Sequence, residues 1–323
     1  MLRRSAVLPA LAALAALLLS LGSPARAGQV RVLVGSGGLT FLPATATVNA
    51  GDHVIWQWSS SPHTVTSGDP NAATPTGDGL FRSSTSGIAS GSRFSWKSGA
   101  VGSHPYYCLP HAPDMAGVVN VVASGAVVAD FRITEVEYAG ASGADRVQIS
   151  NLGTAGGFVD FFRMSWVTAT TQTITNTNVA VAAGAALTLH FNASGTNTAT
   201  DLFFPAMPEL GTQGSFALYV PNSTSTGSTS PASLADATQI LDYVAWGTPG
   251  QAAEPNETTA VSAGFWATSD AVNTDAQLPA GGAGYSISFC GARTDHGASF
   301  WKISRPNFGT SARCLTQIGR AHV

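Results

Sequence analysis

The segment that decides the fold runs from Tyr106 to Met115 and reads YYCLPHAPDM. It places a thiol at Cys108, an imidazole at His111 and a thioether at Met115 within one short loop. A strand-like segment leads into this loop, and an apolar run leads out of it. A thiolate, an imidazole and a weak thioether suit copper that cycles between Cu(I) and Cu(II). The segment therefore predicts a loop that binds copper.

Such a site needs one more nitrogen ligand, and the upstream segment SPHTV supplies His63. Each residue also has an ordinary interpretation, because a lone His is more often a surface or core residue and a lone Met usually packs. Cys108 could be a nucleophile, but a cysteine hydrolase gives no role to Met115. A zinc site would need more Cys or His ligands to close a tetrahedron. Together the four residues predict one copper ion held by His63, Cys108, His111 and Met115.

The three cysteines divide into one in this loop and two near the C-terminal end. We predict a disulfide between Cys290 and Cys314, which leaves Cys108 free. A bridge closing a loop of that size would stabilise the second domain by roughly 3 kcal/mol in the chain-entropy model. A free thiol in an oxidising compartment is a liability unless a metal occupies it, which again favours copper at Cys108.

The N-terminal segment predicts export. Arg3 and Arg4 give a positive start, residues 6–21 an apolar core, and Ala25-Arg26-Ala27 a cleavage site. We expect residues 1–27 to be a bacterial-type signal peptide and the mature chain to have no membrane span. A periplasmic, cell-surface or extracellular location follows. Residues 317–323 read as a non-native tail.

The composition favours strands over helices and excludes nucleic acid as an expected partner. Charged residues make up 10% of the chain, well below the roughly 25% of typical globular proteins. Gly, Ser, Thr, Ala and Val fill the gap, which favours strands and turns. Removing the three signal-peptide arginines leaves 12 of the 15 basic residues and all 18 acidic ones, a formal charge of −6. No Lys/Arg run is present to bind phosphates.

The length after the signal peptide suits two all-β domains, at residues 28–124 and 128–316, with a break near residues 123–125. Alternating segments predict strands in the first domain at Val30–Val34, Thr45–Val48, His53–Trp58, Ser92–Trp96 and Val118–Val122. In the second domain they predict strands at Phe131–Tyr138, Arg146–Ser150, Ala186–Phe191, Phe216–Val220, Ile240–Ala245 and Tyr285–Phe289. The expected architecture is an antiparallel sandwich or barrel followed by a second β-domain.

Residues 30–122 resemble a plastocyanin-like cupredoxin domain. The matching residues are Phe41-Leu42-Pro43, Val48 to Trp56 (VNAGDHVIW), Pro62 to Val65 (PHTV), Tyr106-Tyr107-Cys108, His111, Met115 and Gly117. The resemblance implies a Greek-key β-barrel or sandwich holding one type-1 (blue) copper. It also implies that His63, Cys108 and His111 are equatorial ligands and that Met115 is the axial ligand.

The predicted function is an exported carrier of single electrons with no substrate turnover. His111, flanked by Leu109, Pro110 and Pro113, should lie near the surface under an apolar patch where a redox partner protein docks. Multicopper oxidases and nitrite reductases need further copper sites, with His-x-His pairs or a His beside the Cys. Neither pattern occurs. The alternative is a non-redox cell-surface binding or structural protein with a copper storage or structural site. An esterase- or protease-like enzyme using Cys108 ranks third.

Residues 128–316 resemble a lamin-tail-type domain, an immunoglobulin-like β-sandwich. The resemblance rests on FRITEV at 131–136, VQISN at 147–151, LDYVAWG at 241–247, FWK at 300–302 and PNFG at 306–309. It implies a surface or binding module without known chemistry, suited to docking or surface attachment.

Two further sets of polar residues are expected at ordinary solvent-facing positions. Asp130, Glu135 and Glu137 could hold Ca²⁺, but strand alternation puts two of them on one face, which we expect to be solvated. His53 and His104 are likewise expected on solvent-facing strand positions.

Overall fold

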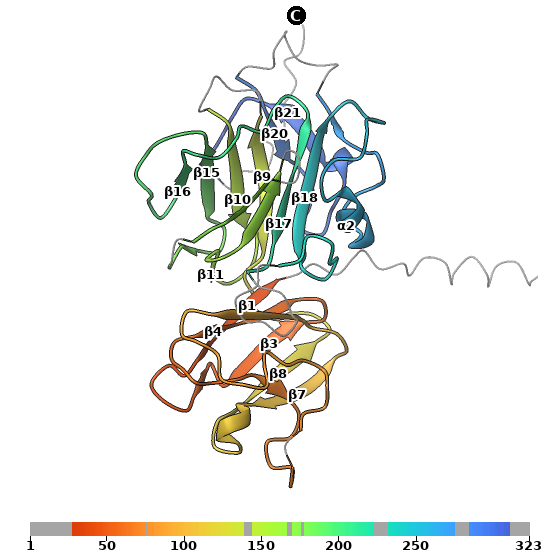
Figure 1. The fold of residues 1–323 in the computed structure, drawn as a ribbon. Helices are drawn as coiled ribbons and strands as arrows, with labels where there is room; N and C mark the ends of the chain where they lie inside the picture. The colour runs from red at the N-terminus through yellow and green to blue at the C-terminus, as the bar shows by residue number, and fades with distance from the viewer. Residues whose placement is uncertain are drawn as a thin grey trace, which may run out of the picture.

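The computed structural model describes residues 28–74, 76–138, 144–166, 170–175, 178–221, 232–274 and 284–310. Across these residues the prediction of an all-β chain is confirmed, since strands dominate and the one α-helix, α2, is short (Glu257–Ser262). Two β-structures are stacked, the N-terminal one below and the C-terminal one above (Figure 1). The predicted signal peptide, Cys314 and the predicted tail lie outside the described residues. No helix of the described residues is long and apolar enough to cross a membrane.

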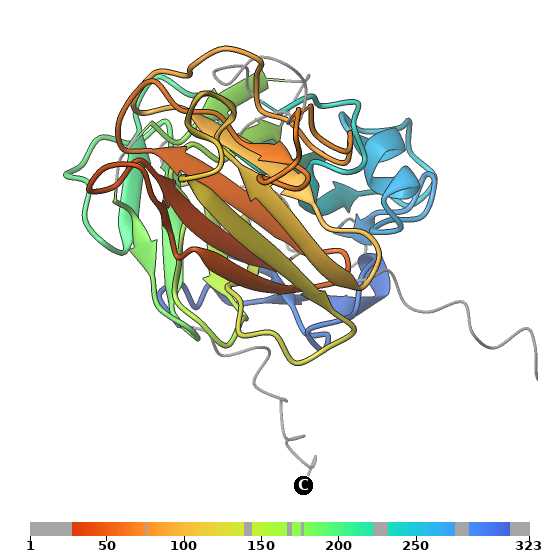
Figure 2. The ribbon, with the colours of Figure 1, turned by 90° about the horizontal axis from the view of Figure 1, so that it is seen from below.

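Residues 29–122 form two four-stranded sheets. The first has the order β2-β1-β4-β6, with bounds Phe41–Leu42, Gln29–Val34, His53–Trp58 and Arg93–Lys97. The second has the order β3-β8-β7-β5, with bounds Thr45–Asn49, Ala116–Val122, Gly102–Tyr107 and Thr66–Ser67. The strands of this part run side by side in the view from below (Figure 2). The two sheets stay separate, so the N-terminal domain is a sandwich and not a closed barrel.

Alternating burial builds the core between these sheets. Every second residue of β8 is buried, and Val119 and Val121 point inward. Aromatic rings fill the centre, where Trp56 lies 5.1 Å from Phe81 and 5.4 Å from Tyr106 between ring centroids. Buried aromatic rings supply large contact areas and pack with defined geometry. They therefore hold β7 rigidly up to the residue before Cys108.

The C-terminal part is a second β-sandwich. Its six-stranded sheet has the order β16-β15-β10-β9-β20-β21, with bounds Asp201–Phe204, Ala186–Phe191, Arg146–Asn151, Phe131–Glu137, Ser286–Phe289 and Trp301–Ser304. Its five-stranded sheet has the order β13-β12-β17-β18-β19, with bounds Thr170–Thr173, Arg163–Trp166, Gly214–Tyr219, Ile240–Gly247 and Val272–Asn273. A small pair joins β11 (Gly157–Phe158) to β14 (Ala180–Val181). The predicted strands of both domains are present, most of them within two residues of the expected bounds.

The two parts meet along β1, which lies next to the C-terminal part in Figure 1. Gln29 and Ala129 exchange two backbone hydrogen bonds, of 2.7 and 3.2 Å. His53, on the neighbouring β4, lies 2.7 Å through Nε2 from the Thr238 carbonyl oxygen of the C-terminal part. The prediction that His53 faces solvent is wrong. The second domain covers this end of β4, so the residue is only 1% exposed. His104 is half-buried on β7.

Asp130, which precedes β9, and Glu135 and Glu137, which lie on it, are all buried. The prediction that they form a solvated face is therefore also wrong. The Glu135 carboxylate accepts hydrogen bonds from Ser286 Oγ at 2.6 Å and from the Asn307 backbone N–H at 2.8 Å. Glu137 forms an ion pair with Arg146. Strand β9 lies inside the six-stranded sheet, where the strands on its two sides, β10 and β20, supply polar donors. These carboxylates are therefore bound by protein donors and not by solvent.

Candidate metal centre

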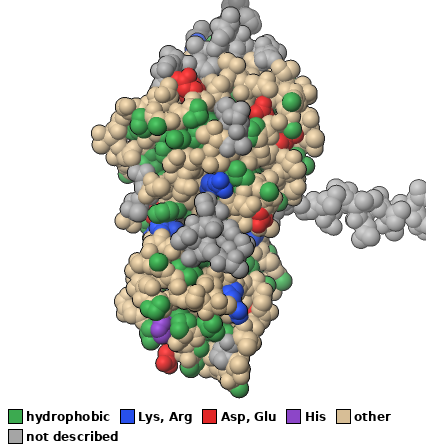
Figure 3. Space-filling view, in the orientation of Figure 1, with side chains coloured by type: hydrophobic (Ala, Val, Ile, Leu, Met, Phe, Trp, Pro, Cys, Tyr) green, Lys and Arg blue, Asp and Glu red, His purple; other side chains and the backbone are tan. Residues whose placement is uncertain are grey.

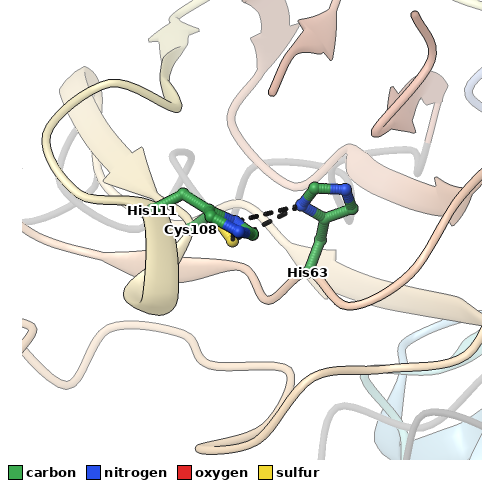
Figure 4. A group of neighbouring side chains, drawn as sticks. All are labelled: His63, Cys108 and His111. Carbon is green, nitrogen blue, oxygen red and sulfur yellow. Dashed lines mark hydrogen bonds between the residues drawn. The ribbon is translucent and has the colours of Figure 1, made fainter. Parts of the chain in front are cut away.

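Three of the four predicted ligands converge at one end of the N-terminal sandwich. The Cys108 Sγ atom lies 3.1 Å from Nδ1 of His111 and 3.8 Å from Nδ1 of His63. The two Nδ1 atoms are 3.3 Å apart. The three side chains point toward one another in Figure 4. In Figure 1 the short helical turn that carries His111 lies at the bottom, at the end opposite the second domain.

A single turn of 3-10 helix brings Cys108 and His111 to the same side of the loop. The turn spans Leu109–His111, and the His111 backbone N–H donates to the Cys108 carbonyl oxygen at 3.0 Å. Side chains three positions apart lie above one another in this type of helix. Pro110 occupies its beginning, where a missing N–H costs no hydrogen bond. The short Cys-x2-His spacing thus becomes a pair of adjacent donor atoms.

Met115 closes the same loop. Its backbone N–H donates to the His111 carbonyl oxygen at 3.0 Å, and its carbonyl accepts from the Cys108 N–H at 2.9 Å. The side chain is fully buried in the apolar cluster that also contains Cys108. The backbone thus returns Met115 to the end of the sandwich where the three donors meet. Its role as a fourth ligand stays a prediction.

Thr64 connects the two segments of the site around the sulfur atom. Its backbone N–H lies 3.2 Å from Cys108 Sγ, and its hydroxyl accepts a 2.7 Å hydrogen bond from the Leu109 N–H. Cys108 is free and fully buried. Burial raises the pKa of the Cys108 thiol, while the hydrogen bond from Thr64 lowers it. A bound cation reverses the effect of burial, because a coordinating thiol is deprotonated.

Ser60 determines which ring nitrogen of His63 carries the proton. The Ser60 hydroxyl donates to the Gly35 carbonyl oxygen at 2.8 Å and lies 3.2 Å from Nε2 of His63. Its single proton is used by Gly35, so the hydroxyl accepts from an N–H on Nε2. The lone pair of His63 is then on Nδ1 and faces the sulfur. Burial lowers the pKa of His63, and nearby His111 lowers it further, which favours the neutral form that binds metals.

Two residues that support His63 were not predicted. Trp58 Nε1 donates to the His63 carbonyl oxygen at 2.9 Å. Gly35 has φ +72°, and a Cβ there would lie 2.1 Å from Ser60 Oγ and 2.6 Å from the His63 ring. Only glycine accepts this backbone conformation and this close approach. Neither residue has a recognisable motif, because each meets His63 only in the folded sheet.

Residues 28–122 match the sequence model of a family described as copper binding proteins of the plastocyanin/azurin family. The cofactor of this part of the chain is copper. The donor set agrees with this assignment, since a buried thiol and two imidazole nitrogens form the ligand combination of blue-copper sites. The Cys290–Cys314 disulfide stays a prediction, because Cys314 lies outside the described residues.

Solved structures with similar folds cover the same part of the chain. They include a purple cupredoxin from Nitrosopumilus maritimus (24% identity, TM-score 0.25, 29% of this chain and 99% of that one). Plastocyanin from Dryopteris crassirhizoma also matches (24% identity, TM-score 0.24, 29% and 100%), as does an amicyanin variant (23% identity, TM-score 0.24, 29% and 83%). No curated protein matches the chain. With TM-scores this low, the structural likenesses carry no argument, and the copper assignment rests on the family match and the donor set.

Proposed function

We propose that this protein carries single electrons through one type-1 copper held by His63, Cys108 and His111, with Met115 as the axial ligand. The observation that supports this most is the convergence of one thiol and two Nδ1 atoms within 4.8 Å of one another, with His63 and Cys108 buried and His111 half-buried. Copper supplies a one-electron change between Cu(I) and Cu(II) at such a ligand set. The proposal includes no substrate turnover, since members of this copper-binding family are typically electron carriers.

The contribution of the protein is rigidity. Thr64 holds both the sulfur and the turn after it, and Ser60 holds the His63 ring, so the donor atoms keep their positions without help from the metal. Outer-shell hydrogen bonds of this kind orient ligands and tune metal sites. Because the donors are already placed, a change of one charge requires little movement of the ligands. Small rearrangement is what fast electron exchange needs.

A partner protein would dock over the loop that carries His111. Pro110 and Pro113 are exposed there, and Leu109 and His111 are half-buried. Leu109, Pro110 and Pro113 are apolar, and Asp114 is the one exposed carboxylate of this loop. A small apolar face of this kind suits the interfaces of transient redox encounters. His111 is the ligand nearest this surface, since His63 and Cys108 are buried. Electrons would therefore enter and leave through the His111 ring.

Export and the role of the second domain belong to the same proposal. The charged start, apolar core and small-residue cleavage motif of residues 1–27 support secretion. The short motifs of residues 128–316 support a lamin-tail-type, immunoglobulin-like module. The second sandwich sits at the end opposite the copper loop (Figure 1), so it would attach the protein to a surface or partner without covering the electron port.

The direct test of the copper site is a visible absorption spectrum of the mature chain with added Cu(II). We expect an intense thiolate-to-copper charge-transfer band and a reversible reduction potential. Cys108→Ser should lose the band entirely, because it removes the only described free thiol. His104→Asn, a half-buried histidine on β7 outside the cluster, should keep it. A colourless, redox-silent copper complex of the wild-type chain would instead support copper storage.

The docking face is tested by a charge placed on it. Leu109→Lys should slow electron exchange with the partner and leave the absorption spectrum unchanged, because the substitution alters the surface and not the donors. Val101→Lys is the matched control, since Val101 is 60% exposed and precedes the opposite end of β7. Equal exchange rates in the two variants would place the electron port elsewhere.

A further inference from the structure

A pocket of about 330 Å³ lies between the two sandwiches. Residues of β1, β4 and β6 line it from the N-terminal side, and residues near β9 and β11 line it from the C-terminal side. Neither domain forms the pocket alone. Its size lies within the range of small-molecule sites, which often occur at domain interfaces. Figure 3 shows positively charged side chains next to hydrophobic ones at the waist between the two parts.

The charges of the lining are not balanced. Arg31 and Arg93 both line the pocket, and Asp160 is the one carboxylate among the described lining residues. Both oxygens of Asp160 already accept backbone hydrogen bonds, from Asn178 at 2.9 Å and Val179 at 2.7 Å. The nearest distance from Arg31 to this carboxylate is 3.9 Å. The lining therefore carries one surplus positive charge.

Aromatic rings orient the two guanidinium groups. The Arg31 guanidinium carbon lies 3.4 Å from the centre of the Phe158 ring, and that of Arg93 lies 3.9 Å from the centre of the Phe161 ring. A guanidinium stacked on a ring keeps its edge available for hydrogen bonds in its own plane. Arg31 uses part of this edge to donate to Gln57 Oε1 at 3.1 Å. Arg93 donates from Nη1 to the Gly91 carbonyl oxygen. Stacking on the rings fixes the planes of both guanidinium groups.

Burial lowers the pKa of both Arg31 and Arg93. Burial lowers the pKa of Arg93 to about 10, with Asp160 raising it and Arg31 lowering it. The pKa of Arg31 is also lowered by burial and raised by Asp160. Both side chains stay charged at neutral pH, and each is less stable in its charged form than it would be in water. An anion in the pocket would relieve this cost.

Apart from Gln29 and Gln57, most of the remaining lining residues are apolar. Leu33 is partly exposed, and Leu42 and Val127 are more than half exposed, at 55% and 67%. Strongly hydrated dianions such as phosphate or sulfate would lose their water shell against these apolar residues without enough charge to replace it. A ligand with a single negative charge would balance the one surplus positive charge of the lining. A compact apolar group on that ligand would fit the apolar lining residues.

We propose that this pocket binds a small monocarboxylate with a compact apolar body, whose carboxylate lies between Arg31 and Arg93 and whose apolar part lies against Leu33 and Leu42. Arg is the side chain that best matches the planar carboxylate, through paired hydrogen bonds. Because both domains supply the lining, the ligand would also strengthen the contact between them. This inference does not depend on copper or on electron transfer.

The test is a calorimetric titration of the mature chain, with and without copper, using benzoate, phenylacetate and isovalerate. We expect one-to-one binding of at least one acid at similar affinity in both forms. Benzamide, which keeps the shape of benzoate without its charge, should bind roughly tenfold or more weakly than benzoate, because it loses a charge-assisted contact. This comparison needs only the wild-type protein.

Variants then locate the site. Arg31→Gln and Arg93→Gln should each weaken binding of the preferred acid by roughly tenfold or more. Arg305→Gln should bind it like the wild type, since Arg305 lies over Tyr285 and is not part of the lining. The proposal is overturned if none of the acids binds up to its solubility limit. It is equally overturned if benzamide binds as tightly as benzoate, or if both pocket variants bind like Arg305→Gln.

Discussion

Two histidines at the two ends of β4 show how similar burial leads to different chemistry. His53 begins the strand and His63 follows it, and they are 1% and 4% exposed. Burial lowers the pKa of both imidazoles. At His63 the Nδ1 atom faces a thiol and a second imidazole, whereas Nε2 of His53 contacts only the Thr238 carbonyl oxygen of the other domain.

Convergence of donor atoms, and not burial, therefore distinguishes the metal site. The Ser60 hydroxyl directs the lone pair of His63 toward Cys108. At His53 the carbonyl partner requires a proton on Nε2, and the buried Nδ1 has no hydrogen-bond partner among the residues that the structure describes. The lone pair of His63 is thus directed toward a cation, whereas His53 forms a hydrogen bond between the two domains. Experiments can test each of these two assignments.

The largest expected effect separates the two histidines by copper binding. His63→Gln should abolish the charge-transfer band and weaken copper binding by more than about 100-fold, since loss of outer-shell partners alone costs about 10–100-fold. His53→Gln should leave the band unchanged, because its side chain lies at the opposite end of β4 from the donors. Absorption spectra and copper titrations of both variants measure this. Loss of the band in both variants would mean that the fold, and not the ligand, had been removed.

The next effect concerns acid stability. The pKa of His53 is lowered from 6.5 to about 4, first by burial, so the unfolded chain binds a proton before the folded chain as the pH falls. The free energy of unfolding should therefore decrease between about pH 6.5 and pH 4, by up to about 3 kcal/mol from this residue. His53→Gln keeps a donor for the Thr238 carbonyl and cannot titrate, so it should lose this part of the pH dependence.

Urea unfolding of the metal-free protein at pH 7 and near pH 4.5 measures this effect. Other groups titrate over the same range, and comparison of the wild type with His53→Gln removes their contribution. If both proteins lose the same stability on acidification, His53 is not the group that links the domain contact to pH.

The sequence predicted the three residues whose donor atoms converge because most of the cluster is local. Cys108, His111 and Met115 lie within eight residues, and one helical turn is enough to bring two of their donor atoms together. His63 was predicted from chemistry, since the loop lacked a second nitrogen. These inferences required no knowledge of how the sheets pair.

The supports of the site could not be predicted, because they depend on strand pairing. Strands β1 and β4 are parallel neighbours, with Val34 opposite Trp58, so the residues that follow them leave the sheet side by side. Gly35 meets Ser60 and His63 only for this reason. The burial of His53 and of the β9 carboxylates has the same origin, because it depends on a neighbouring domain or strand that no local pattern reveals.

Gly35 provides the smallest and most specific test of this support. Gly35→Ala should destabilise the protein by about 2 kcal/mol, from the positive φ and from a new Cβ pressed against Ser60 and His63. Gly37→Ala is the matched control, since Gly37 has φ +85° with open space around its Cβ position. It should cost about 1 kcal/mol through backbone conformation alone.

The two alanine variants should differ most clearly in the copper spectrum. Gly35→Ala displaces the His63 ring or its Ser60 partner, so the charge-transfer band and the reduction potential should shift. Gly37→Ala strains a neighbouring loop position without touching a ligand, so both should stay at their wild-type values. Denaturant titration and voltammetry measure the two quantities separately. An unshifted band in a destabilised Gly35→Ala protein would show that the His63 position is set by Trp58 and the 63–65 backbone, and not by the Gly35–Ser60 contact.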